Sequence, residues 1–279
     1  MFQRALLSLF VLVLWAGPAR ASLEAWLAPS AKPWPRWEAH DANAKTMLDH
    51  GPWQRFLDTY RAGAPDGVAR VAYGRVSAAD KAALDGYVRA LAAARVSALS
   101  REEQRAFWIN LYNAATVRLV VERYPLASIR DIDISPGLFA TGPWGKKLFE
   151  VEGIALSLDD IEHRILRPIW KDARIHYALN CASIGCPDLL GEAFTAANTE
   201  ALLEKGARGF VNHPRGARVV DGRLRVSSIY VWFQDDFGGG EAGVLAHLRR
   251  YAAPPLAESL APIRAIDATG YDWELNDWR

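Results

Sequence analysis

Cysteine is scarce: the 279-residue chain has only two, Cys181 and Cys186. Two cysteines cannot form the several bridges of a small disulfide-rich domain, and they cannot supply a four-cysteine zinc site. Net charge is nearly absent too, because 33 Lys and Arg residues face 32 Asp and Glu residues. Proteins that bind a phosphate backbone carry a basic surface, so this balance argues against nucleic-acid binding. Disorder is excluded as well, since 51% of the residues are hydrophobic.

Long apolar runs are also lacking. The run near the N-terminus, residues 5–16, is shorter than the roughly 20 apolar residues of a membrane-spanning helix. Arg4 precedes this run, and Ala19 and Ala21, the small residues on either side of Arg20, fit a signal-peptide cleavage site. We therefore predict a signal peptide over 1–21, a periplasmic or secreted location, and no stable membrane span after signal cleavage. An uncleaved N-terminal anchor is the alternative, and it would export the folded part equally.

Helix signals are clear in the first two thirds of the chain. Ser77, Ser100 and Ser157 are each followed three residues later by an acidic residue, which is the pattern of a helix N-cap. The predicted helix 102–123 is apolar almost all round, so we expect it to lie at the centre of the fold.

Asn110 and Asn113 are the polar exceptions in this predicted helix. They are three residues apart and therefore lie on one side of it. Buried amides must find hydrogen-bond partners, so one interpretation is that they bond to neighbouring backbone. The other is that they line or brace a functional site.

Strand signals are shorter. Residues 174–180 and 228–233 read as strands, and Asp221-Gly222 predicts the turn of a hairpin. We therefore expect an α+β fold, with a helical N-terminal half packed on a small, mostly antiparallel sheet.

One segment, 174–187, concentrates the residues that could do chemistry, because it holds His176 and both cysteines. In a first interpretation Cys181 is a nucleophile and His176 is its general base and acid, since a thiol with a pKa of about 8.5 needs a nearby imidazole to ionise. Glu162 would then orient His176, as the third member of a catalytic triad does. Glu162 also has a purely structural explanation, a favourable charge near a helix N-terminus.

Other interpretations of this segment stay open. An exported protein can keep a disulfide, so Cys181 and Cys186 are equally able to form a bridge. A metal site could combine His176 and the cysteines with Glu162 or His163, but the usual spacing of metal-binding pairs is missing, and we expect no metal. The thiols could also be inert and buried. We expect the remaining histidines at the protein surface: His40, His50, His213 and His247.

Four blocks of the sequence together resemble the DUF547 family. They are FWINLYNA (107–114), LDDIEH (158–163) with LR (166–167), HYALNCAS (176–183) with GCP (185–187), and SIYVW (228–232) with DF (236–237). The family's name records that its function is unassigned. The resemblance implies a core with cysteine and histidine that is similar to papain-like or transglutaminase-like thiol enzymes, which is an analogy of fold and does not settle the chemistry.

The resemblance runs from about Asp66 to Tyr251, and it implies a domain organisation and a set of site residues. The predicted organisation is a signal peptide (1–21), a lead-in with helices (22–65), a DUF547-like α+β domain (66–251) and a C-terminal extension (252–279). The matching polar positions are Asn110, Asn113, Glu162, His163, Arg167, His176, Asn180, Cys181, Ser183, Cys186 and Asp236.

From these residues we expect an exported, cysteine-dependent hydrolase or acyl transferase that needs no cofactor and acts on an unknown small molecule or peptide. Cys181, His176 and Glu162 would be catalytic, and Asn180 or the backbone near Ser183 would bind the oxyanion. The alternative is a non-enzymatic envelope binding module. In that case Cys181 and Cys186 are bridged, and some of the 11 tryptophans form a binding face.

Overall fold

The computed structural model describes residues 29–137 and 141–278. The predicted signal peptide, 1–21, lies outside the described residues. Within the two described ranges, no helix is both long and apolar enough to cross a membrane.

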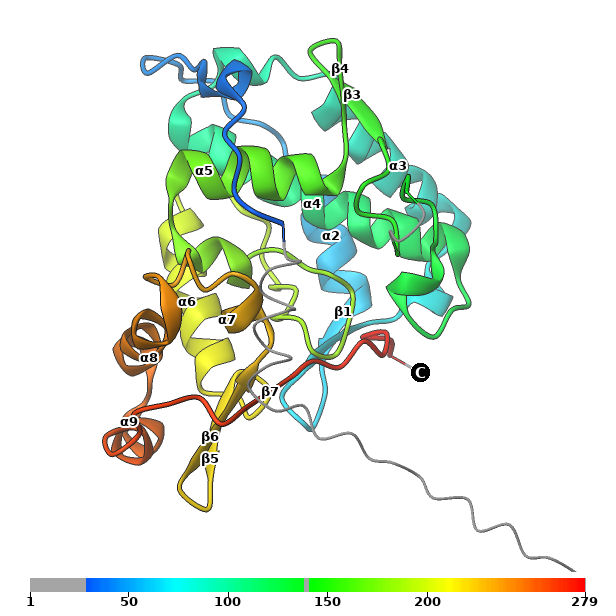
Figure 1. The fold of residues 1–279 in the computed structure, drawn as a ribbon. Coiled ribbons are helices and arrows are strands. Elements are labelled where there is room, and N and C mark those ends of the chain that lie inside the picture. The colour runs from blue at the N-terminus through cyan, green and yellow to red at the C-terminus, as the bar shows by residue number, and fades with distance from the viewer. Residues whose placement is uncertain (1–28, 138–140, 279) are drawn as a thin grey trace, which may run out of the picture.

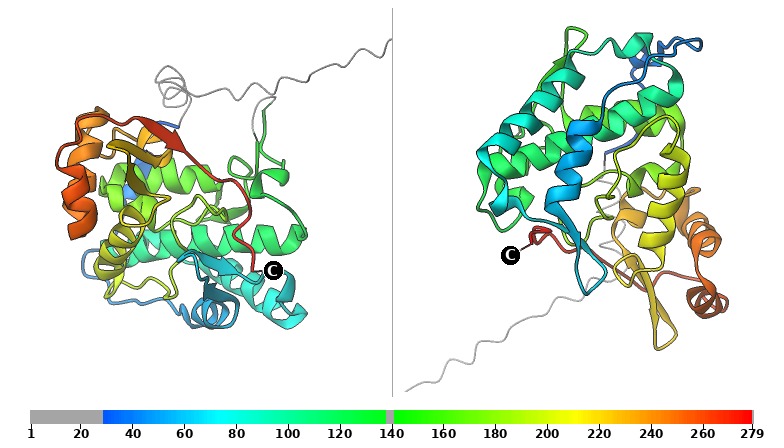
Figure 2. Two further views of the ribbon diagram at one scale, coloured as in Figure 1. Left: turned by 90° about the horizontal axis from the view of Figure 1, so that it is seen from below. Right: turned by 180° about the vertical axis from the view of Figure 1, so that it is seen from behind.

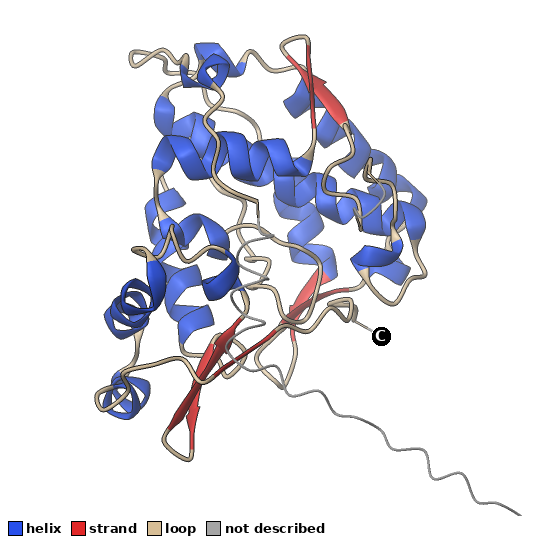
Figure 3. Cartoon of the chain, in the orientation of Figure 1, coloured by secondary structure: helices blue, strands red, loops and turns tan. Residues whose placement is uncertain are grey.

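Helices account for most of the regular structure (Figures 1 and 3). The α-helices are α2 (Gly51–Tyr60), α3 (Ala78–Ala92), α4 (Arg101–Arg123), α5 (Arg167–Trp170), α6 (Thr199–Val211), α7 (Ile229–Trp232), α8 (Gly240–Tyr251) and α9 (Pro254–Leu260). A π-helical segment, η5 (Asp160–Leu166), runs directly into α5. The short 3-10 helices are η1 (Pro35–Glu38), η2 (Tyr73–Arg75), η3 (Val96–Ala98), η4 (Ile129–Asp131) and η6 (Ala173–Tyr177).

The strands are short and form small sheets. They are β1 (Arg61–Gly63), β2 (Ala69–Val71), β3 (Phe149–Val151), β4 (Ile154–Leu156), β5 (Ala217–Val220), β6 (Arg223–Ser227) and β7 (Ala268–Gly270). β1 pairs with β2, β3 with β4 and β5 with β6, all antiparallel, and β7 adds to β6 in parallel. Asp221 and Gly222 both have positive φ, 52° and 72°, as the tight turn of the β5–β6 hairpin requires. The predicted α+β class is confirmed, and so is the hairpin.

The helix α4 crosses the middle of the molecule (Figures 1 and 2). It begins where the sequence predicts, because the Ser100 side chain accepts a hydrogen bond from the backbone N–H of Glu103 at 3.3 Å. Residues 103–117 of this helix are all buried, and α3, η5 and α6 pack against it. α4 is therefore the centre of the larger hydrophobic core.

A second hydrophobic core lies between α6, the β5–β6 hairpin, α7 and α8. Tyr177 belongs to this second core, whereas the next residue, Ala178, belongs to the core around α4. The segment that leads to Cys181 thus runs along the junction of the two cores, where its backbone is held from both sides.

Two predicted strands are wrong. Residues 173–177 form η6, which begins where the Asp172 side chain accepts a hydrogen bond from the backbone N–H of Arg174 at 2.9 Å. Residues 229–232 form the short helix α7. Short apolar runs such as these have no distinctive periodicity, so packing against the rest of the fold decides between strand and helix.

The amides of Asn110 and Asn113 bind backbone far along the chain. Asn113 donates to the carbonyl of Ala178 and accepts from the N–H of Asn180, both at 2.8 Å. Asn110 does the same with Phe194, at 2.7 and 3.0 Å. Segments 178–180 and 194 lie in no sheet, so these side chains replace the partners that a neighbouring strand would provide. Both asparagines therefore bond to backbone, and Asn113 also braces the segment before Cys181.

We expect Asn113→Ala to lower the free energy of unfolding by about 2–4 kcal/mol, because it leaves the buried N–H of Asn180 and the carbonyl of Ala178 without a partner. Urea denaturation measures this change. The control is Asn43→Ala at an exposed position, which should change stability by no more than about 0.5 kcal/mol. Equal effects of the two substitutions would contradict the bracing role.

Candidate functional site

A pocket of about 620 Å³ brings together the three residues that the sequence predicts to be catalytic. Cys181, His176 and Glu162 all line it, together with His163. They come from three different segments: Glu162 and His163 from η5, His176 from η6, and Cys181 from the loop that follows. A pocket that gathers titratable groups among apolar walls is the best candidate for a binding or catalytic site.

His176 lies between two carboxylates. Its Nε2 donates to Asp236 Oδ2 at 2.7 Å, and its Nδ1 faces Glu162 Oε1 at 3.6 Å. The ring also stacks on Phe233, with centroids 4.4 Å apart. Burial alone would lower the pKa of His176, but the hydrogen bonds to the two carboxylates outweigh it and raise the pKa above its ordinary value. The imidazolium form is therefore favoured.

Glu162 is the acidic centre of this cluster. Tyr112, from α4, donates a hydrogen bond to Glu162 Oε2 at 3.1 Å, and both His163 and His176 face the other oxygen. Burial opposes ionisation of Glu162, but the neighbouring His163, His176 and Arg167 outweigh it and hold its pKa below the ordinary range. The carboxylate is thus ionised beside the His176 imidazole, as the sequence interpretation requires of an orienting residue.

Arg167 contacts Asp236 and His163, and it fixes the tautomer of His163. Its Nε donates to Asp236 Oδ2 at 2.5 Å, the same oxygen that binds His176. One of its terminal nitrogens lies 3.0 Å from His163 Nδ1. A guanidinium can only donate, so His163 accepts at Nδ1 and carries its proton on Nε2, which faces Asp159. Burial lowers the pKa of His163 to about 4, in agreement with this neutral form.

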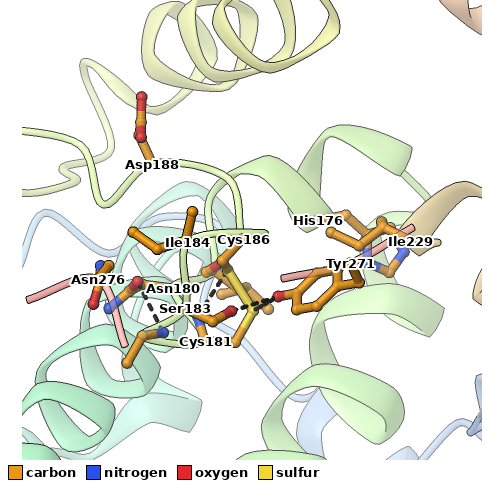
Figure 4. Close-up of a disulfide and its surroundings, with 12 residues drawn as sticks. His176, Asn180, Cys181, Ser183, Ile184, Cys186, Asp188, Ile229, Tyr271 and Asn276 are labelled. Atoms are coloured by element: carbon orange, nitrogen blue, oxygen red, sulfur yellow. Dashed lines mark hydrogen bonds between the residues drawn. A yellow bond between two sulfur atoms is a disulfide. The ribbon is translucent and has the colours of Figure 1, made fainter. Parts of the chain in front are cut away.

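The two cysteines form a disulfide, with their Cα atoms 5.9 Å apart. Cys181 lies at the pocket wall, where its sulfur is 3.1 Å from the Tyr271 hydroxyl, while Cys186 is buried behind it. Figure 4 shows the Tyr271 hydroxyl pointing toward the disulfide, with His176 beyond the Tyr271 ring. The nitrogens of His176 face carboxylates, and in this oxidised form Cys181 is no nucleophile. The catalytic roles of the three residues stay a prediction.

The remaining predicted residues support the pocket from outside. Asn180 is buried, and its side chain accepts from the backbone N–H of Ala182 at 3.1 Å, so it turns into its own loop. Ser183 is buried, and its hydroxyl lies 2.8 Å from that of Tyr271. Asp236 and Arg167 hold His176 and His163, and the pocket lining includes neither of them.

The structure adds pocket residues that the sequence did not single out. Trp144, Trp232, Tyr271 and Trp273 form a continuous aromatic wall. Tyr271 and Trp273 belong to the predicted C-terminal extension, 252–279, which nothing in the sequence pattern connected with the cysteines. The one available signal was the density of aromatic residues in the last ten positions.

The C-terminal segment reaches the pocket because its backbone pairs with the cysteine loop. Ile184 N–H donates to Glu274 O, and Gly185 N–H donates to Asp272 O, both at 2.8 Å. A Cβ at Gly185 would lie only 2.6 Å from the backbone nitrogen of Asp272, so glycine is required for this close approach. The small residues of the loop thus admit a neighbouring backbone.

Asp159 is another acidic residue of the pocket that the prediction left out. Burial, together with the negative charges of Glu162 and Asp160, raises the pKa of Asp159 to about 7. Its side chain keeps 44% of its surface exposed, so the carboxyl group can still reach a ligand. Near neutral pH the pocket therefore contains one carboxylate, Glu162, and one carboxyl group that titrates.

The expectation that the other histidines lie at the surface is wrong for His247 and for His50. His247 is half-buried, its Nε2 lies 2.7 Å from the Tyr177 hydroxyl, and burial lowers its pKa to about 4. His50 lies deeper. It is buried, its Nδ1 lies 2.7 Å from the Tyr87 hydroxyl, and burial lowers its pKa to about 4. The polar neighbours of His50 in sequence did not reveal that α2 and α3 pack together around it. In the described part of the chain, no group of three or more His, Cys, Asp or Glu side chains could hold a metal ion.

Comparison with protein families agrees with three of the four sequence blocks. Residues 96–211 match the family described as "Protein of unknown function, DUF547". The chain carries a DUF547 domain. The matched residues include α4, η5, η6, α6 and the cysteine loop, whereas the block at 228–237, with Asp236, lies beyond them. No curated protein and no solved structure matches the chain. A papain-like or transglutaminase-like core stays a prediction.

We make one prediction for the charged cluster around His176, with the substitution Asp236→Asn. The substitution removes the closest counter-ion of the His176 imidazolium, so we expect the pKa of His176 to fall below its value in the wild type. NMR titration of the labelled imidazole measures it. Asp235→Asn, at the exposed neighbouring position, is the control and should leave the His176 titration unchanged.

We also expect the loss of stability caused by Asp236→Asn to depend on pH. Because the folded pKa of His176 is raised, its stabilising contribution is fully present below pH 6.5 and is lost as the pH rises through the folded value. Asp236→Asn should therefore cost more stability at about pH 6 than at about pH 9. A cost that does not depend on pH in this range would show that His176 gains nothing from Asp236.

Proposed function

We propose that the protein is an exported binding protein whose pocket takes a ligand with a sugar ring. The aromatic wall carries this proposal. Trp232 and Trp273 are stacked with centroids 5.9 Å apart, and Tyr271 lies 5.0 Å from Trp232 and 4.5 Å from Trp273. These side chains are half-buried and line the pocket, so they offer ring surface to a ligand.

The polar groups of the pocket favour a sugar over a purely apolar ligand. Asp159 and Glu162 line the same pocket, together with the hydroxyl-bearing Ser135 and Thr141. An apolar ligand would remove water from these groups and offer no hydrogen bond in return, which is costly. A sugar offers a C–H face that stacks on an aromatic ring and hydroxyl groups that bond to carboxylates.

The disulfide supports a binding role in the oxidised form. It joins Cys181 to Cys186 at the pocket wall, and the Tyr271 hydroxyl contacts the Cys181 sulfur. Tyr271 is thereby held beside Ser183 as part of the wall. A preformed wall binds a ligand without losing much conformational entropy.

We expect Trp232→Ala to weaken sugar binding about tenfold, because one stacked ring contributes roughly 1 kcal/mol or more. Titration with the disaccharides maltose, cellobiose and chitobiose, followed by tryptophan fluorescence, measures the affinity. Trp170→Ala is the matched control, since Trp170 is also half-buried but does not line the pocket. If Trp232→Ala and Trp170→Ala both bind the disaccharides as the wild type does, or if both fail to bind them, the result would contradict a site on the aromatic wall.

A cysteine-dependent hydrolase or acyl transferase is the second candidate. One observation favours it: Cys181, His176 and Glu162 line a single pocket although they come from separate segments. In such an enzyme Cys181 would act only after reduction of the disulfide, with His176 as acid and base and Glu162 as the orienting carboxylate.

For this second candidate we expect hydrolysis of a chromogenic ester, such as p-nitrophenyl acetate, only by the reduced protein. The oxidised protein is one control, because its Cys181 sulfur is bonded to Cys186. The other control is Cys181→Ser, which should lose the activity under the same reducing conditions. Equal rates for Cys181→Ser and the wild type would remove Cys181 as the nucleophile.

A further inference from the structure

The two sulfurs of the disulfide differ in access. Cys186 has only 1% of its surface exposed, whereas Cys181 is partly exposed and lines the pocket. Thiol–disulfide exchange requires an incoming thiolate to touch the sulfur that it attacks. A thiol that enters the pocket therefore reaches the Cys181 sulfur, and the buried sulfur of Cys186 is the leaving group.

The leaving sulfur has a hydrogen-bond donor in place. The backbone N–H of Cys181 donates to Cys186 Sγ at 2.9 Å. Negative charge develops on the leaving sulfur during exchange, and a donor at this position stabilises it. On the other side, the hydroxyl of Tyr271 lies 3.1 Å from Cys181 Sγ and 2.8 Å from Ser183 Oγ. Each sulfur thus has a polar group beside it, and the one beside Cys186 can stabilise the charge that develops there.

We propose that the Cys181–Cys186 disulfide is a reactive part of the pocket and that Cys181 exchanges with a small thiol bound there. The incoming thiolate forms a bond to the Cys181 sulfur, and the bond between Cys181 and Cys186 breaks. Its electron pair goes to the Cys186 sulfur, which takes up the proton that the small thiol lost on ionising. The product carries the small thiol on Cys181 and a buried thiol at Cys186.

This mixed disulfide can react further in two ways, each a thiol–disulfide exchange. The Cys186 thiolate can attack Cys181, release the small thiol and restore the original bridge. A second thiolate can instead attack the sulfur of the bound small thiol, which releases a small-molecule disulfide and leaves both cysteines reduced. The second reaction yields Cys181 as the free thiol that thiol catalysis would need. The exchange does not depend on the proposed sugar ligand, which contacts the aromatic wall.

The position of the mixed disulfide in the wild-type protein tests the proposal. Oxidised protein is treated with limiting 2-mercaptoethanol, free thiols are blocked with iodoacetamide, and peptides are mapped by mass spectrometry. We expect 2-mercaptoethanol on Cys181 and the blocking group on Cys186. The reverse distribution, or an equal one, would overturn the proposal. A disulfide that does not react with 2-mercaptoethanol until the protein is unfolded would also overturn it.

A matched pair of variants gives the second test. Cys186→Ser leaves Cys181 free, and Cys181→Ser leaves Cys186 free, so both have lost the same bridge. We expect iodoacetamide to label Cys186→Ser at least about tenfold faster than Cys181→Ser, because thiol reactivity follows exposure. Circular dichroism checks that both variants are folded. Equal labelling rates in folded variants would overturn the proposal, and if either variant is unfolded the wild-type peptide map decides.

The sugar-binding proposal can fail separately. Trp232→Ala removes part of the aromatic wall and leaves the disulfide bonded as before, so it should weaken binding of the disaccharides and keep the preference of 2-mercaptoethanol for Cys181. Loss of the preference for Cys181 in the wild type would overturn the exchange alone.

Discussion

The pair of hydrogen bonds between Asn113 and the backbone on either side of Leu179 positions the candidate site. The segment 178–183 lies in neither a helix nor a sheet, yet it is almost wholly buried, so its backbone groups need partners. Asn113 supplies two of them from the centre of α4. Because α4 is buried on nearly all sides, it is a rigid support for the loop that carries Cys181. The placement of this sulfur at the pocket wall follows from that support.

A buried network of charges then arranges the polar side of the pocket. Arg167 and His176 share one oxygen of Asp236, and His176 in turn faces Glu162. Removing these groups from water is costly, and only mutual pairing offsets the cost. The network joins η5, α5 and η6 to the loop after α7, so it links the two hydrophobic cores at the site where they meet. His176 is held between carboxylates and favours its charged form.

The apolar side of the pocket depends on the end of the chain. β7 pairs with β6, and the residues after it run along the cysteine loop, where Gly185 allows close contact with Asp272. This pairing places Tyr271 and Trp273 beside Trp232. One surface therefore combines an aromatic wall, titratable carboxyl groups and an accessible disulfide sulfur. The ligand binding and the thiol exchange that we propose both depend on this one surface.

The sequence by itself determined the features that depend on neighbours a few residues apart. The N-caps at Ser77 and Ser100, the turn at Asp221-Gly222 and the helix that follows Ser100 were predictable, because each is fixed by a local hydrogen bond, backbone torsion or apolar pattern. The sequence blocks within 96–211 indicated the family and contain His176, Cys181 and Glu162, which meet in one pocket.

Only the tertiary structure decided which partners these residues have. Segment 174–180 looked like a strand, but in the structure its first four residues belong to the 3-10 helix η6, which lies where the two cores meet. His176 bonds to Asp236, which is sixty residues away in the sequence. Tyr271 contacts the disulfide from the C-terminal segment. No local sequence pattern predicts either contact. His50 is buried for the same reason. Long-range contacts depend on how whole elements pack, and neither residue type nor spacing along one segment contains that information.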